Sequence, residues 1–145
     1  MTHRAEIKGL VIAAVAGVVA PFVLASLAGE FSAHVWLPTV RYLWYSHGVA
    51  VSNLAFYALR DVVLGMLLGV VAGLGIGRLS RTPYLSQWLA FVASFVLSTG
   101  LPALLVYEYD LLVFFFTSPL ILAFLTLSVL GFWMAGKRKA ITHVG

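Results

Sequence analysis

Residues 62–78 read VVLGMLLGVVAGLGIGR, an uninterrupted apolar run that ends at an arginine. Glycine recurs in this run at every fourth position, at Gly65, Gly69, Gly73 and Gly77. Residues four apart lie on one face of an α-helix, and glycine lets another backbone approach that face closely. The stretch therefore predicts an apolar helix whose glycine face packs against another helix.

The composition of the whole chain indicates that this helix lies in a membrane. Of the 145 residues, 62% are hydrophobic and only 10% are charged, and the mean hydropathy is +1.03. A soluble domain has about 25% charged residues. The chain has no cysteine, which excludes disulfides, thiolate metal sites and iron–sulfur clusters. We therefore predict an all-α integral membrane protein.

Four apolar segments are long enough to cross a bilayer, which takes about 20 residues each. They cover residues 9–28, 58–77, 84–106 and 111–135. The second helix could begin near residue 49, because no proline interrupts residues 49–77. The first segment also resembles a signal peptide, but its apolar core exceeds the usual ~7–15 residues. Because the later connections are short, we expect an antiparallel four-helix bundle that forms a single domain over residues 1–145.

Basic residues divide unequally between the two sides of this bundle. With the N-terminus inside, seven of the nine Lys and Arg residues lie inside: Arg4, Lys8, Arg78, Arg81, Lys137, Arg138 and Lys139. Only Arg41 and Arg60 lie outside. Cytoplasmic loops carry an excess of Lys and Arg, so we predict a bacterial cytoplasmic (inner) membrane protein with both termini in the cytoplasm. The last three of these basic residues would also attract anionic lipid, and the run is too short to indicate nucleic-acid binding.

Residues 29–48 form the only sizeable loop, which lies on the outer side. The loop is rich in aromatic residues, namely Phe31, Trp36, Tyr42, Trp44 and Tyr45. Tyr and Trp favour the membrane–water interface. We expect an interfacial helix or a re-entrant hairpin, with Pro38 as a break. The segment would serve as an aromatic belt or, alternatively, as a lid or docking surface for a partner or lipid.

A second face of small residues lies in the first segment, at Gly9, Ala13 and Gly17. Such faces pack helices within one four-helix monomer, or they join one chain to another. The first functional hypothesis follows from the second alternative. It is a non-enzymatic membrane protein that assembles through its glycine and alanine faces, as a homo-oligomer or as a subunit of a larger membrane complex.

Charged residues near the membrane interior are few. Arg60 and Asp61 lie at the outer end of the second segment, and Glu108 and Asp110 lie in the outer connection between the third and fourth. Ionisable residues in a membrane are costly and often functional. The second hypothesis is therefore a small channel or carrier for an ion, a solute or a lipid-linked substrate, with these four residues at its outer mouth.

Signals for catalysis and for bound metal are weak. The sequence contains no phosphate-binding loop, no Gly-x-Ser-x-Gly motif and no HExxH motif. His34 and His47 could join outer acidic residues around a metal ion, but no tight ligand spacing supports a site. We therefore predict no enzyme activity, no metal and no cofactor. A membrane enzyme that acts on lipid is the third class, and its only candidates are Asp61, Glu108, Asp110, His34 and His47.

Overall fold

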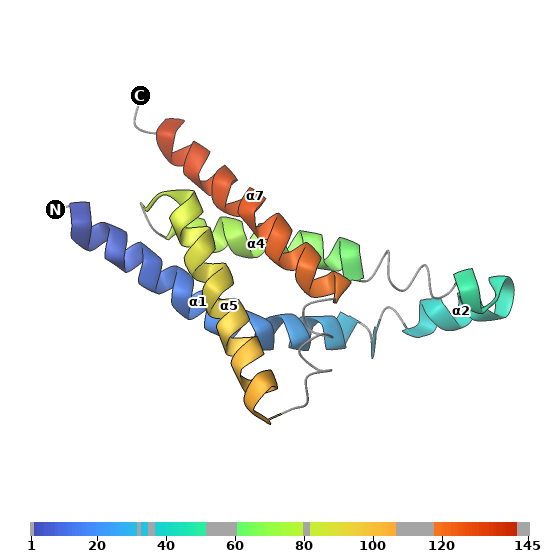
Figure 1. Cartoon of the computed structure of the whole chain (residues 1–145). Helices are drawn as coiled ribbons and strands as arrows, with labels where there is room; N and C mark the ends of the chain where they lie inside the picture. Colours follow the sequence, from blue (N-terminus) through green and yellow to red (C-terminus); the bar gives the residue numbers. More distant parts are fainter. Residues whose placement is uncertain are drawn as a thin grey trace.

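The computed structural model describes residues 2–31, 33–34, 37–51, 61–79, 82–106 and 118–141, and within them the regular structure is helical. The principal helices are α1 (Thr2–Phe31), α2 (Leu37–His47), α4 (Leu64–Arg78), α5 (Tyr84–Val106) and α7 (Pro119–Ile141) (Figure 1). Four stretches are long and apolar enough to cross a membrane: Arg4–Phe31, Asp61–Arg78, Tyr84–Pro102 and Pro119–Lys137. The prediction of an all-α protein with four such helices is confirmed.

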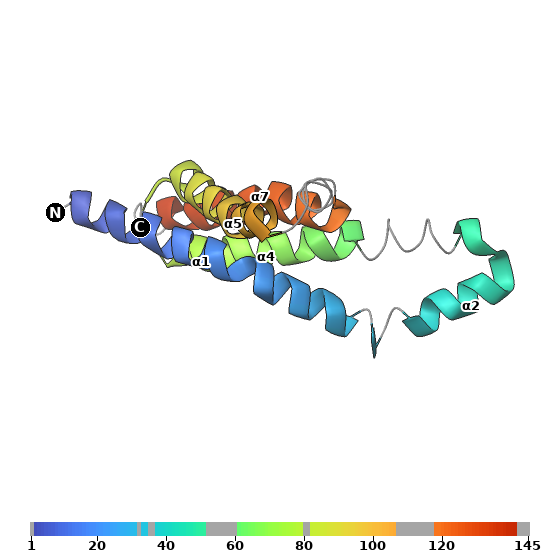
Figure 2. The same ribbon diagram turned by 60° about the horizontal axis from the view of Figure 1, so that its bottom comes forward.

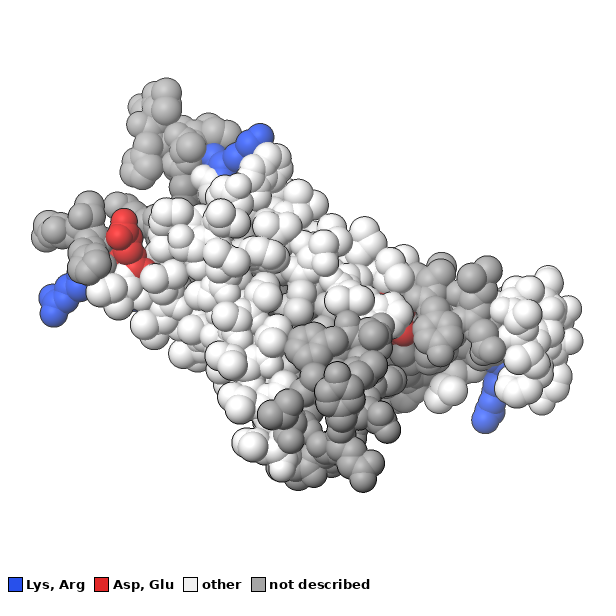
Figure 3. Space-filling view, in the orientation of Figure 1, with Lys and Arg blue, Asp and Glu red and all other residues white. Residues whose placement is uncertain are grey.

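The surface of these helices requires a lipid environment. Within an apolar window of 18 residues in each stretch, only 17 to 28% of the residues are buried inside the protein. Large apolar side chains such as Phe22 (69% exposed) and Val71 (67% exposed) point outward. Figure 3 shows the coloured charged side chains toward the two ends of this face and white, uncharged surface between them. Apolar surface of this extent is covered by lipid in an integral membrane protein.

Two prolines begin helices. Pro38 is the second residue of α2, and Pro119 is the first residue of α7. Proline is favoured in the first turn of a helix, where its missing N–H has no acceptor to lose. Pro38 therefore lies at the start of a helix, and whether it breaks the aromatic segment stays a prediction, because residues 35–36 lie outside the described residues. The early part of the second predicted span, residues 52–60, lies outside the described residues.

The most extensive contact in the bundle joins α4 to α7. Gly65 lies against Leu120, with 2.6 Å between an added Cβ and the Leu120 carbonyl oxygen, and Gly77 lies against Ala135. Because the residue numbers on both helices rise together, α4 and α7 run parallel (Figure 1).

The second most extensive contact joins α1 to α5. Gly17 lies against the Phe91 backbone and the Ser94 side chain. Near the start of both helices, the Thr82 hydroxyl donates a hydrogen bond of 3.1 Å to the Glu6 carbonyl oxygen. These helices also run parallel. The main packing therefore differs from the predicted antiparallel packing of chain neighbours, since α4 and α5 make few contacts.

Glycine allows the α4 and α7 backbones to touch. A Cβ at Gly69 would collide with the Phe124 carbonyl oxygen, and a Cβ at Gly73 would collide with the Ser128 carbonyl oxygen. In the reverse direction, Gly131 of α7 lies against the α4 backbone. The glycine face of α4 therefore packs within the chain in this structure.

Phenylalanines connect the two helix pairs. Phe91 of α5 lies 6.0 Å from Phe124 and 5.8 Å from Phe132 of α7, measured between ring centroids. The rings are tilted, an arrangement that aromatic pairs favour. Trp88 adds a polar link, since its Nε1 donates hydrogen bonds to the Leu125 carbonyl oxygen at 3.2 Å and to another α7 acceptor, the Ser128 hydroxyl, at 3.1 Å.

The glycine contacts predict a sharp contrast between two substitutions in α4. Gly73→Ala forces the α4 and α7 backbones apart and should lower the free energy of unfolding by about 2 kcal/mol or more. Gly75→Ala meets no atom within 4 Å and should leave stability unchanged or raise it by up to ~1 kcal/mol, because alanine favours the helix. Denaturation of both variants in detergent, followed by circular dichroism, measures the difference. Equal stability of the two variants would contradict the backbone contact.

Candidate functional site: a lateral groove between α1 and α4

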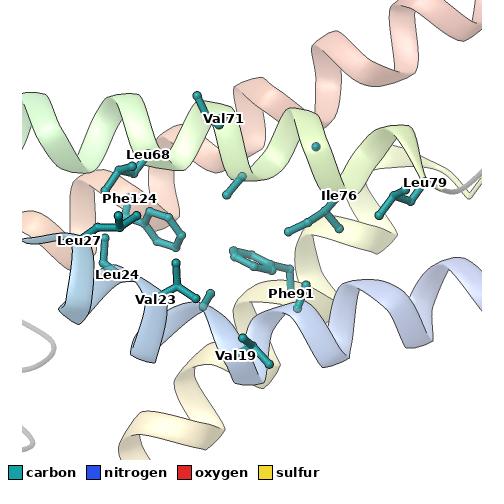
Figure 4. A pocket seen from close by; sticks show the side chains of 14 residues that line it. Val19, Val23, Leu24, Leu27, Leu68, Val71, Ile76, Leu79, Phe91 and Phe124 are labelled. Carbon is teal, nitrogen blue, oxygen red and sulfur yellow. The ribbon is translucent and has the colours of Figure 1, made fainter.

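A groove with a volume of about 510 Å³ lies between α1 and α4, within the range of ~300–1,000 Å³ typical of small-molecule sites. Six residues of α1 line it: Ala16, Val19, Ala20, Val23, Leu24 and Leu27. Six residues of the α4 segment line the other side: Leu68, Val71, Ala72, Gly75, Ile76 and Leu79. Phe91 and Phe124 lie between the two sides (Figure 4). We call this feature the lateral groove.

The pairing of the helices explains the groove. Gly17 of α1 packs against α5, and Gly73 of α4 packs against α7. The small-residue face of each helix is therefore covered by its parallel partner. α1 and α4 consequently make few contacts with each other. Figure 2 shows the two helices diverging toward the end at which α1 finishes and α4 begins. The space between them is bounded by apolar residues on the faces of α1 and α4 that do not pack against α5 or α7.

The lining of the groove favours a hydrocarbon ligand. All lining side chains are aliphatic or phenylalanine, and Gly75 has none, so no side chain offers a donor or acceptor. Transfer of an ion or polar solute into such surroundings is strongly unfavourable without compensating hydrogen bonds. A hydrocarbon chain has no polar groups and needs no hydrogen bonds from the lining. The groove can therefore hold an acyl or prenyl chain and offers nothing to a hydrated solute.

The dimensions favour one chain over a whole helix. Leu68 and Leu79 lie eleven residues apart, which is about 17 Å along the helix axis. Even the whole empty space of about 1010 Å³, spread over that length, leaves a mean cross-section of only about 60 Å². An α-helix with its side chains is ~10–12 Å across and covers about 80–110 Å².

Gly75 differs from the other glycines of α4. Cβ atoms added at Gly65, Gly69, Gly73 and Gly77 would meet α7, whereas one added at Gly75 meets nothing within 4 Å. Internal packing therefore does not require glycine at this position. The missing side chain at Gly75 leaves the groove wider at this point.

The predicted outer mouth is represented by one residue. Asp61 is 3% exposed and lies at the start of a short π-helical turn before α4, outside the groove lining. Arg60, Glu108 and Asp110 lie outside the described residues. Whether these four residues form one site therefore stays a prediction.

The histidine candidates show no metal-binding geometry in the described part of the chain. His34 Nε2 lies 3.1 Å from a Glu30 carboxylate oxygen, and both side chains are exposed. No group of three His, Cys, Asp or Glu residues suited to a metal ion occurs among the described residues. The absence of metal and of catalysis remains a prediction from the sequence.

The aromatic segment and the basic C-terminal run lie away from the groove. Tyr45 of α2 is 91% exposed, and α2 extends beyond the bundle without extensive contact with the other described helices (Figures 1 and 2). Lys137 Nζ lies 4.0 Å from the ring centroid of Trp133, a cation–π contact on α7. The side chains of Arg138 and Lys139 lie outside the described residues.

Gln87 is a buried polar residue that the sequence analysis missed. It is 1% exposed, and its Nε2 has no hydrogen-bond acceptor among the described residues. It lies one helical turn before Phe91, on the side of α5 that faces the interior. An amide near the start of an apolar segment was the available signal, but its burial depends on the packing of the other helices.

Comparison with known protein families, with curated protein sequences and with solved structures finds no match to this chain.

The unsatisfied amide predicts that Gln87→Met stabilises the protein. Methionine has a similar volume, and it would replace a buried amide whose Nε2 has no acceptor among the described residues, so it should raise the free energy of unfolding by about 1–3 kcal/mol. Gln87→Glu, which introduces a carboxyl group in the same space, should lower it. Unfolding in detergent measures both variants. A destabilised Gln87→Met protein would show that the amide has a binding partner in solution.

Proposed function

We propose that this chain is a non-enzymatic membrane protein that holds the hydrocarbon chain of a lipid or lipid-linked molecule in the lateral groove. The observation that carries the proposal is the groove itself, about 510 Å³ in volume and lined by aliphatic and phenylalanine side chains. The proposal develops the lipid-linked alternative in the carrier hypothesis. It places the ligand between α1 and α4 instead of at Asp61.

Assembly through the glycine faces has less support. A second chain that docked on Gly65, Gly69, Gly73 and Gly77 would have to displace α7, because these glycines are buried against it. A chain docked at Gly17 would likewise displace α5. Assembly into a homo-oligomer or a larger complex stays a prediction, and it requires another surface.

Filling the groove should remove the bound lipid. Gly75→Phe places a ring where the structure has open space, so the fold should persist while the groove closes. Two controls separate this effect from general damage. Gly75→Ala adds one methyl group to the groove, and Val15→Phe adds a ring on an exposed side of α1 that does not line it.

Native mass spectrometry after purification in mild detergent counts the lipids that stay bound to each variant. The wild type and both controls should retain a lipid that Gly75→Phe loses. Identical lipid occupancy in all four proteins would refute binding in the groove.

The predicted orientation can be tested independently, because the chain has no cysteine of its own. Glu6→Cys introduces a thiol at an exposed position near the start of α1. His34→Cys introduces one at an exposed position just beyond its end. A membrane-impermeant thiol reagent added to intact cells should label the His34→Cys protein and spare the Glu6→Cys protein until the cells are opened. The reverse pattern would overturn the assignment of the N-terminus to the cytoplasm.

A further inference from the structure

Two exposed cations flank one end of the lateral groove. Arg78 is the last residue of α4 and follows the groove residue Val71 by seven positions, which places it within about 20° of Val71 around the helix. Lys8 precedes Val19 by eleven positions and lies within about 20° of it around α1. Val71 and Val19 lie at the exposed edge of the lining, so both cations lie on the lipid-facing side of the groove mouth.

Contacts between the segments place these cations at the same end of the bundle. The hydrogen bond from Thr82 to the Glu6 carbonyl oxygen ties the connection after α4 to the first turns of α1. Figure 1 shows the start of α1 and the end of α4 at the same side of the molecule. Lys8 precedes Ala16, the nearest lining residue of α1, by eight residues or about 12 Å, so an anionic group just beyond this end of the groove would lie between the levels of Arg78 and Lys8.

The surrounding charges are complementary to an anion. Among residues with described side chains, this end of the bundle carries Arg4, Lys8, Arg78 and Lys137 against one acidic residue, Glu6. The opposite ends of α1 and α4 carry the acidic residues Glu30 and Asp61. The groove lining adds no carboxylate. Among the described residues, the charges that attract an anion therefore lie at this end of the groove.

The length of the groove matches one leaflet of a membrane. Its extent of about 17 Å is close to half of the ~30 Å hydrocarbon core of a bilayer. A phospholipid whose phosphate lies at Arg78 would run its acyl chain along the groove toward Leu68 and Leu27, the lining residues furthest from Arg78 (Figure 4).

From this geometry we infer that the lateral groove selects an anionic phospholipid, with an acyl chain between α1 and α4 and the phosphate bound by Arg78 and Lys8. The guanidinium of arginine presents paired donors that suit phosphate oxygens, and lysine supplies a second point charge. The inference rests on the proposed function, because the chain-binding groove brings the headgroup to the two cations. Beyond the proposed function, the inference specifies that the headgroup is anionic and that Arg78 and Lys8 bind it.

Titration with two lipids that share the same acyl chains tests the inference. Phosphatidylglycerol and phosphatidylcholine are added separately to the delipidated protein in mild detergent, and native mass spectrometry gives the dissociation constant of each. Wild-type protein should bind phosphatidylglycerol several-fold more tightly. Arg78→Gln and Lys8→Gln should each reduce this preference by about five-fold, the effect of one basic residue near an anionic headgroup.

A matched control separates the groove from general attraction to a basic surface. Lys137→Gln removes the same charge at the same end of the bundle, but from α7, which contributes only Phe124 to the groove. This variant should keep the wild-type preference. An equal loss of preference in Lys137→Gln and Arg78→Gln would overturn binding of the headgroup at Arg78.

The remaining outcomes distinguish the inference from the proposed function. If both lipids bind equally and Gly75→Phe weakens both, the groove holds a chain but the anionic selectivity is refuted. If Gly75→Phe leaves the dissociation constants of both lipids unchanged, the proposed function is refuted and the inference is refuted with it. A mass that corresponds to two protein chains in place of a lipid adduct would show that a second copy covers the groove.

Discussion

The structure depends on direct contact between the backbones of α4 and α7. In a bilayer the hydrophobic effect supplies little attraction between helices, so close van der Waals contact must hold them together. Gly73 against the Ser128 carbonyl oxygen and Gly131 against the α4 backbone permit that contact. Gly17 gives α1 the same kind of approach to α5. The arrangement of the bundle therefore depends on which helix faces carry glycine and allow another backbone to come into contact.

The groove is a consequence of how these close contacts are distributed. Each small face serves one parallel partner, and the two pairs meet through the tilted rings of Phe91, Phe124 and Phe132. These rings join α5 to α7 over about two turns of α7. The result between α1 and α4 is the lateral groove, an apolar surface with basic residues near one end. The packing that joins the helices in pairs therefore also leaves the apolar groove between α1 and α4.

The sequence predicted the helices and one packing face, because apolar length and glycine spacing are local properties. It did not predict the partner of that face. Outward-facing residues such as Val71 and Phe22 are as apolar as the interior, so no hydrophobic pattern distinguishes the lipid side from the protein side. The groove depends on that choice of partner, as does the burial of Gln87. Asp61 was identified from its charge alone, and its predicted companions lie outside the described residues.

The parallel pairing also bears on the order in which the protein is made. α4 leaves the ribosome before α7, and roughly 40 residues of further synthesis separate them, about 2–8 s at ordinary rates of translation. During that interval the glycine face of α4 has no partner from its own chain. α1 waits in the same way for α5. Assembly in the membrane therefore cannot proceed by docking each new helix onto the one before it, and the early helices stay open to competing partners until the last one arrives.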